Sequence, residues 1–131
     1  KRKTVVRAVP SERIRISING TKETRMAFRI GFGSGAVALL QLTSESRIKW
    51  GVNEHNQLCL AIAEPSALSR KVVLDKASGG MSVAFRAQDL GMSKRLHRQD
   101  YQFYALRDEN GCQVIGVKDF RLPDGILTGG K

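Results

Sequence analysis

Apolar and polar residues alternate along much of the chain, and this alternation predicts β-strands. In residues 13–18 ("RIRISI") isoleucine occupies every second position, with arginine at two of the positions between. A period of two places the isoleucines on one face of a strand and the arginines on the other. Asn19–Gly20 then predicts a turn, and residues 24–30 ("TRMAFRI") predict the returning strand of a hairpin.

The register of this first hairpin follows from matching the apolar faces. A two-residue turn at Asn19–Gly20 would put Arg25 opposite Ile14 and mismatch the faces. A three-residue loop with a bulge pairs Ile14 with Met26 instead, and we expect that pairing.

Further strands follow from the same pattern. They are predicted at 47–52, 58–62, 71–74, 81–87, 101–106 and 112–117, with Ile48, Trp50, Val52, Leu58, Leu60 and Ile62 facing inward. Turns are expected at 53–56 and at 108–111, where Gly111 takes the left-handed conformation. One short helix is expected within residues 86–98, with Gly91 as its stop or kink. Residues 121–131 are expected to form a flexible tail.

The two halves of the chain have the same predicted order of elements. The tripeptide Ala-Phe-Arg occurs at 27–29 and again at 84–86, and each copy belongs to a strand-turn-strand-connector-strand-turn-strand series. We therefore expect one compact, mainly β domain over residues 1–120, a small barrel of two ββ-connector-ββ units spanning 13–64 and 70–119. An ancient duplication and a coincidence of similar hairpins both account for this pattern.

The second half resembles the swapped-hairpin domains of AbrB-like transition regulators. Residues 82–92 ("SVAFRAQDLGM") are similar to that family's strand followed by a turn of helix, and 101–117 to its closing hairpin. The first half departs, because 31–42 ("GFGSGAVALLQL") stands where a helix is expected, and the family's Ile-Pro step is missing in both halves. The resemblance implies an interlocked barrel that binds DNA, built as a monomeric pseudo-dimer or a homodimer.

Three glycines, Gly31, Gly33 and Gly35, raise the question of a phosphate-binding loop. A P-loop needs Lys-Ser/Thr directly after its glycines, and this chain has Ala36–Val37 there. The dinucleotide fingerprint has different glycine spacing and needs a parallel βαβ unit. We therefore interpret the glycines as a bent strand or a connector that crosses close to another backbone, and we expect no cofactor.

Charge points to a polyanionic partner. The 131 residues carry 22 Lys and Arg against 12 Asp and Glu, a net charge of +10. The basic residues fall into two groups, and arginine suits phosphates and guanine edges. The candidate nucleic-acid-binding residues are Arg13, Arg15, Arg25, Arg29, Arg86, Lys94, Arg95 and Arg98.

Catalytic and metal-binding patterns are missing from the sequence. His55 and His97 have no evident partner nearby in the chain, and no metal-ligand spacing or nucleophile elbow is present. Cys59 and Cys112 lie in apolar runs and are expected to be buried thiols in a reducing compartment. No stretch is long and apolar enough to span a membrane. We expect a cytoplasmic protein, nucleoid-associated if it binds DNA, that is not an enzyme and has no metal.

These features favour a non-catalytic, basic protein that binds duplex DNA, as a transcriptional regulator or an architectural protein. A single-stranded DNA or RNA binder is an alternative, and it would need exposed aromatic side chains such as Trp50, Phe103 or Tyr104. A protein-interaction module that docks an acidic partner is a further alternative. A solvated basic surface with no ligand would also explain the charge.

Overall fold

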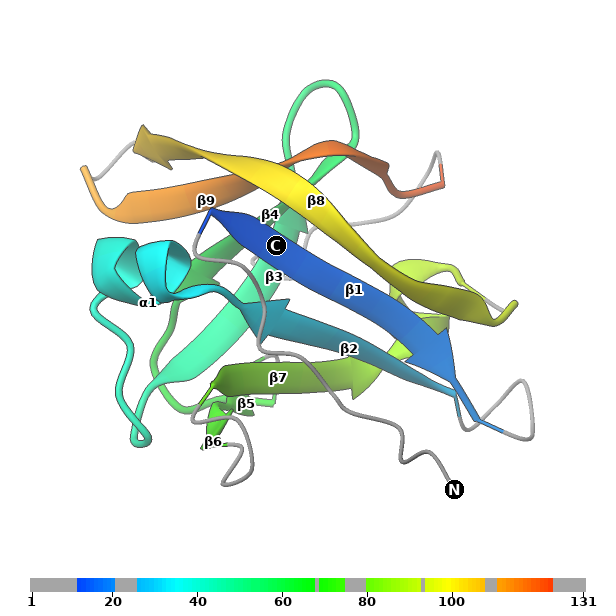
Figure 1. The fold of residues 1–131 in the computed structure, drawn as a ribbon, viewed down its shortest axis with the longest axis horizontal. Coiled ribbons are helices and arrows are strands. Elements are labelled where there is room, and N and C mark those ends of the chain that lie inside the picture. The colour runs from blue at the N-terminus through cyan, green and yellow to red at the C-terminus, as the bar shows by residue number, and fades with distance from the viewer. Residues whose placement is uncertain are drawn as a thin grey trace, which may run out of the picture.

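Every strand pairing among the described residues is antiparallel, and these strands belong to one sheet (Figure 1). The computed structural model describes residues 12–20, 26–67, 69–74, 80–92, 94–107 and 111–123. Its elements are β1 (Arg13–Asn19), β2 (Ala27–Phe32), α1 (Ser34–Leu40), β3 (Arg47–Val52), β4 (Gln57–Ile62), β5 (Arg70–Lys71), β6 (Val73–Leu74), β7 (Met81–Arg86), the 3₁₀ helix η2 (Ala87–Leu90), β8 (Leu96–Arg107) and β9 (Gln113–Arg121).

The sheet curls into a nearly closed barrel. Its strand order is β5-β3-β4-β9-β8-β1-β2-β7-β6, so β5 and β6 stand at opposite ends of the order. These two strands are consecutive in the chain and are separated only by Val72, which is buried. One short stretch therefore pairs with β3 on one side and β7 on the other. The expected mainly β barrel is confirmed.

The core is made from the inward faces that the alternation predicts. Ile14, Ile16 and Ile18 of β1 are at most 2% exposed. Phe120 of β9 packs edge-on against both Phe28 and Tyr101, with ring centroids 5.7 and 5.3 Å apart. The largest fully buried side chains are Phe28, Ile14, Ile16, Ile30, Ile48, Leu58, Leu60, Leu90, Ile115, Val83 and Val117. Burial of these apolar side chains is the main favourable contribution to folding.

The predicted first hairpin has the correct faces and the wrong register. Ile14 pairs with Phe32, and Ile16 pairs with Ile30, so the expected pairing of Ile14 with Met26 is wrong. The chain leaves β1 at Asn19 and joins β2 at Ala27, a much longer connection than three residues. A longer connection with even displacement keeps the apolar residues on one face, because side chains alternate with a period of two.

The glycine segment leads from a strand into a helix that the sequence analysis did not predict. Gly31 lies in β2, Gly33 precedes the first residue of α1, and Gly35 is inside the helix. α1 lies at one end of the sheet, contacts β1, β2 and β9, and buries Ala36 and Leu40 (Figure 1). Interpreting the segment as a bent strand or a plain connector is therefore wrong. β2 is antiparallel to both of its neighbours, so the βαβ setting of a dinucleotide site is absent from this part of the structure.

The predicted short helix in the second half is present as a single 3₁₀ turn. η2 covers Ala87–Leu90, and Gly91 ends it with a φ of 75°, in the left-handed region. From Leu96 onward the chain is the long strand β8, so a helix does not extend to residue 98.

Alternation fails at the end of β4, where Ala61 is buried and Ile62 is 44% exposed, contrary to its expected inward position.

The expected turns and tail are found in part. Residues 53–56 form a turn, and Gly111 has a φ of 81°, as expected; residues 108–110 lie outside the described residues. Leu122 is buried and its N–H donates to the Asn56 carbonyl at 2.8 Å, so the first residues of the expected tail belong to the fold. Residues 124–131 lie outside the described residues.

The strand pairings relate the two halves of the chain by a two-fold symmetry. When each strand is replaced by its counterpart in the other half, the same set of pairings results. The hairpins β1–β2 and β3–β4 correspond to β6–β7 and β8–β9, with β5 and β6 counted as one strand. The two Ala-Phe-Arg tripeptides pair with each other, so Phe28 faces Phe85. Cys59 faces Gly116, a pair with the same separation of 57 positions. This order is what two interlocked copies of one unit would have, and the duplication itself stays a prediction.

Gly116 provides a test of the packing on the outer side of the β4–β9 pair. A Cβ built on Gly116 would lie 2.5 Å from Tyr104 Cζ. The Tyr104 hydroxyl donates to Gln57 Oε1 and accepts from Asn53 Nδ2, which keeps the ring in place. We expect Gly116→Ala to lower the free energy of unfolding by about 1–3 kcal/mol, the usual cost of overpacking, measured by chemical denaturation.

The control for this prediction removes the ring. In a Tyr104→Ala background the added methyl group has no ring to meet, so Gly116→Ala should cost much less there. Equal losses in the two backgrounds would show that the ring is not the reason for glycine at this position.

Candidate nucleic-acid interface

A β-bulge in β8 contributes two residues to a basic groove on the surface. Ile16 of β1 pairs with Gln99, whereas Ile18 pairs with Leu96, so two residues of β8 stand opposite the single residue Ser17. The two bulge residues are His97 and Arg98. A bulge bends the strand and redirects its side chains. Both residues consequently line one side of the same groove.

The groove has a volume of about 500 Å³ and lies across β1, β2 and the start of β8. Among the described residues, its walls carry three arginines, one histidine and two small polar side chains, and no acidic residue. The lining residues are Ser17, Ile18, Asn19, Arg29, Arg95, Leu96, His97 and Arg98.

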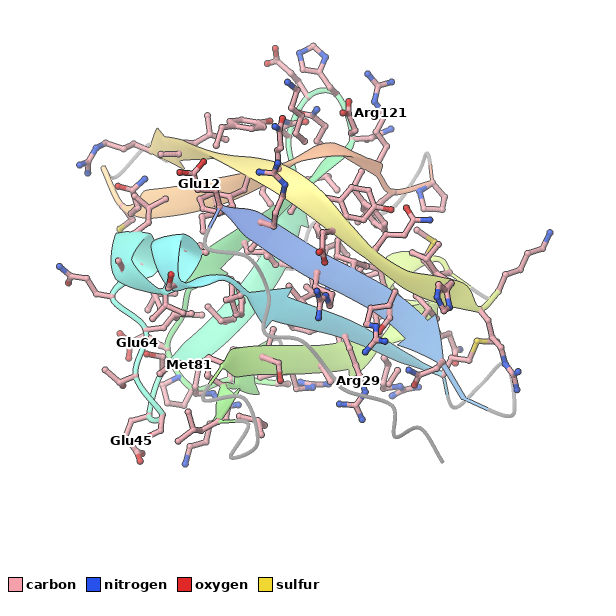
Figure 2. All side chains as sticks on the ribbon, in the orientation of Figure 1. Glu12, Arg29, Glu45, Glu64, Met81 and Arg121 are labelled. Atoms are coloured by element: carbon pink, nitrogen blue, oxygen red, sulfur yellow. The ribbon has the colours of Figure 1, made fainter. Side chains whose placement is uncertain are left out.

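Three of the eight predicted binding residues meet in this groove. Arg29 is exposed on β2 and stands between Ser17 of β1 and Ala84 of β7 (Figure 2). The Arg95 Nε donates to the Gly20 carbonyl at 2.9 Å, which holds its guanidinium beside the end of β1. Neither Arg29 nor Arg98 forms a hydrogen bond or ion pair with a described residue. Like charges that line one groove repel one another, and a bound anion would relieve that repulsion.

Arg15 is predicted as a binding residue, but its guanidinium is already engaged. Its Nε donates to Asp100 Oδ1 at 2.7 Å, and its Nη2 donates to Oδ2 at 3.2 Å. The hydrogen bond to Asp100 is the main reason that the pKa of Arg15 is raised above its ordinary value. Arg15 therefore adds little net positive charge to the surface.

The remaining predicted residues lie outside the groove or outside the described residues. Arg13 is half-buried on β1 and donates to the Glu12 carbonyl at 3.0 Å. Arg86 ends β7 and Lys94 precedes β8, and both are exposed without lining the groove. Arg25 lies outside the described residues, so the expected face of four arginines is not assembled from described side chains.

Small side chains surround Arg29 on the outer face of the β1–β2–β7 region. Next to the paired, buried Phe28 and Phe85, the outward positions hold Arg29 opposite Ala84 and Arg86 opposite Ala27. Arg29 and Arg86 are therefore diagonal neighbours on β2 and β7, a relation that places residues roughly 7–8 Å apart. In Figure 2 the labelled acids Glu45 and Glu64 lie toward the other end of β2. Small neighbouring side chains leave room for a ligand backbone to approach Arg29.

Sequence reasoning missed Ser17, Asn19, His97 and Asp100 as parts of this surface. Ser17 and Asn19 continue the outward positions of the strand that carries Arg13 and Arg15, so the alternation contained a signal for them. His97 and Asp100 reach the surface only through the pairing of β1 with β8, and the sequence contains no signal for that pairing.

The aromatic candidates for base stacking are not exposed. Trp50 is 7% exposed, and Phe103 is half-buried against the core. Tyr104 is half-buried and hydrogen-bonded to Gln57 and Asn53. Single-strand binders of the common kind need aromatic faces open to the solvent.

The described residues contain no group of three His, Cys, Asp or Glu side chains placed to hold a metal ion. His55 Nε2 lies 3.4 Å from Glu54 Oε2, an exposed contact that the sequence analysis did not foresee.

The two cysteines are not joined by a disulfide, and Cys112 is exposed rather than buried as expected, because it precedes β9 instead of lying inside it. None of the helices within the described ranges has the length and apolar character needed to cross a membrane.

Comparison with known proteins adds no relative: no family model matches the chain, and neither the curated proteins nor the solved structures contain a match.

The two cysteines should differ in reactivity. Burial raises the pKa of the Cys59 thiol, so a smaller fraction is thiolate at any pH below that pKa. Because the thiolate is the nucleophile, a maleimide should modify the exposed Cys112 first at neutral pH, and the rate at Cys59 should rise as the pH is increased. Mass spectrometry of partly labelled protein measures both rates, and faster modification of Cys59 at neutral pH would contradict the placement of β4.

Proposed function

We propose that the protein is a non-catalytic, duplex DNA-binding protein, a transcriptional regulator or architectural protein, that holds the phosphate backbone in the groove between β1, β2 and β8. The single observation that carries this proposal is the convergence of Arg29, Arg95 and Arg98 in one groove whose described lining residues include no acid. Ser17 and Asn19 add neutral hydrogen-bonding groups of the kind that contact phosphate and sugar.

Two further observations support contact with a phosphate backbone over stacking with single-stranded bases. The aromatic side chains are buried or half-buried, so the surface offers no stacking platform. Arg29 and Arg86 occupy corresponding positions in the two paired Ala-Phe-Arg tripeptides, which extends the basic surface from β2 onto β7. Such an array contacts successive phosphates without reading individual bases.

The test is a binding titration against duplex DNA, single-stranded DNA and RNA of one sequence and length at two salt concentrations. Affinity for the duplex should be highest and should fall steeply with salt, because each neutralised phosphate releases condensed counterions. Tightest binding to a single strand would favour the single-strand alternative. Absence of binding to all three nucleic acids at low salt would leave the protein-interaction alternative.

Charge-removal variants locate the site. Arg98→Ala should weaken duplex binding and reduce the slope of log affinity against log salt by about 0.9, the value for one lost phosphate contact. Arg95→Ala should do the same, with some added loss because Arg95 also bonds to Gly20. The matched control is Lys118→Ala, an exposed cation on β9 that does not line the groove. Equal losses from all three variants would indicate diffuse attraction with no defined site.

A further inference from the structure

The Arg15–Asp100 ion pair lies within the proposed binding surface. Arg15 and Asp100 stand directly opposite one another on β1 and β8. Their side chains are 18% and 30% exposed, so the pair faces solvent on the outer side of the barrel. Asp100 follows Arg98 by two positions along β8, and Arg15 precedes Ser17 by two along β1. The Arg15–Asp100 pair therefore borders the groove beside Arg98.

The carboxylate of Asp100 has the geometry that a phosphate would have at this position. It takes two donors of the Arg15 guanidinium through two different oxygens. Carboxylates and phosphates accept the same paired hydrogen bonds from arginine, since both present two oxygens to its planar fork. Arg15 is consequently oriented for phosphate while its donors are occupied.

We propose that Asp100 is an internal competitor for phosphate at Arg15, so that this residue sets the affinity of the surface for nucleic acid. This inference rests on the proposed function, because it assumes that phosphates reach the adjacent groove. A duplex phosphate next to Arg98 is repelled by Asp100 and has to share or displace its carboxylate to reach Arg15. Removing the charge of Asp100 both ends the repulsion and frees one donor set.

A purely structural ion pair makes the opposite prediction. If the pair served only to join β1 to β8, its loss would loosen the bulge and scatter the groove arginines. Duplex affinity would then fall together with thermal stability. The sign of the change in affinity therefore separates the two roles.

The experiment measures duplex affinity for Asp100→Asn against Asp89→Asn at 50 and 200 mM salt. Asp89 is an exposed carboxylate on η2 that forms no ion pair with a described residue, so its replacement changes the net charge equally without freeing an arginine. Asp100→Asn should tighten binding about tenfold at 50 mM salt, the effect of one charge-assisted contact. That gain should shrink about three- to fourfold at 200 mM, because one added contact steepens the salt slope by about 0.9. Asp89→Asn should change affinity much less.

Arg15→Ala, made in the otherwise unchanged protein and in the Asp100→Asn background, completes a double-mutant cycle. In the otherwise unchanged protein it should cost less affinity than Arg98→Ala, because Asp100 already occupies Arg15. In the Asp100→Asn background it should remove the part of the gain that comes from the freed Arg15 donors, and should therefore cost more affinity there than in the otherwise unchanged protein. The competitor role is overturned if Asp100→Asn equals Asp89→Asn or weakens binding, or if Arg15→Ala costs the same in both backgrounds. Failure of the proposed function is distinguishable. In that case the unchanged protein, Asp100→Asn and Asp89→Asn all fail to bind duplex DNA.

Discussion

The alternation of isoleucine with polar residues along β1 is the constraint on which the rest of the structure depends. It commits one face of the strand to the core, where Ile14, Ile16 and Ile18 are almost completely buried. The opposite face must then carry Arg15 and Ser17 outward. β1 lies between β2 and β8 and pairs with both along its two edges, and its outward residues Ser17 and Asn19 line the groove.

Pairing of β1 with β8 brings together residues that are far apart in the chain. Arg15 and Asp100 are separated by 85 positions, and the groove combines the ends of β1 with the start of β8. The bulge opposite Ser17 turns two consecutive basic residues toward the same groove, which regular pairing would not allow. The groove therefore combines a basic cluster that is visible in the sequence, Arg95 and Arg98, with Arg29, which only strand pairing brings beside it.

The strands and their buried faces were predictable because a period of two is a local property. The register between β1 and β2 was not, since it depends on the connection between Asn19 and Ala27, and the sequence signal at Asn19–Gly20 indicated a shorter loop. α1 was missed because its seven residues follow Gly31 and Gly33, contain Gly35, and have no side-chain cap at Gly33. Three of the eight predicted binding residues share the groove, whereas the engagement of Arg15 by Asp100 required knowledge of the β1–β8 pairing.

The central position of β1 has a consequence for synthesis on the ribosome. β1 is made before every other described strand, yet its partner β8 follows about eighty residues later, on the order of ten seconds at usual elongation rates. Until β8 is made, the edge of β1 that pairs with β8 in the finished barrel lacks that partner. Arginines on the outer face of this waiting edge oppose its pairing with other chains, because like charges repel across adjacent strands. The same side chains would thus protect the nascent protein from aggregation before they serve in the finished barrel.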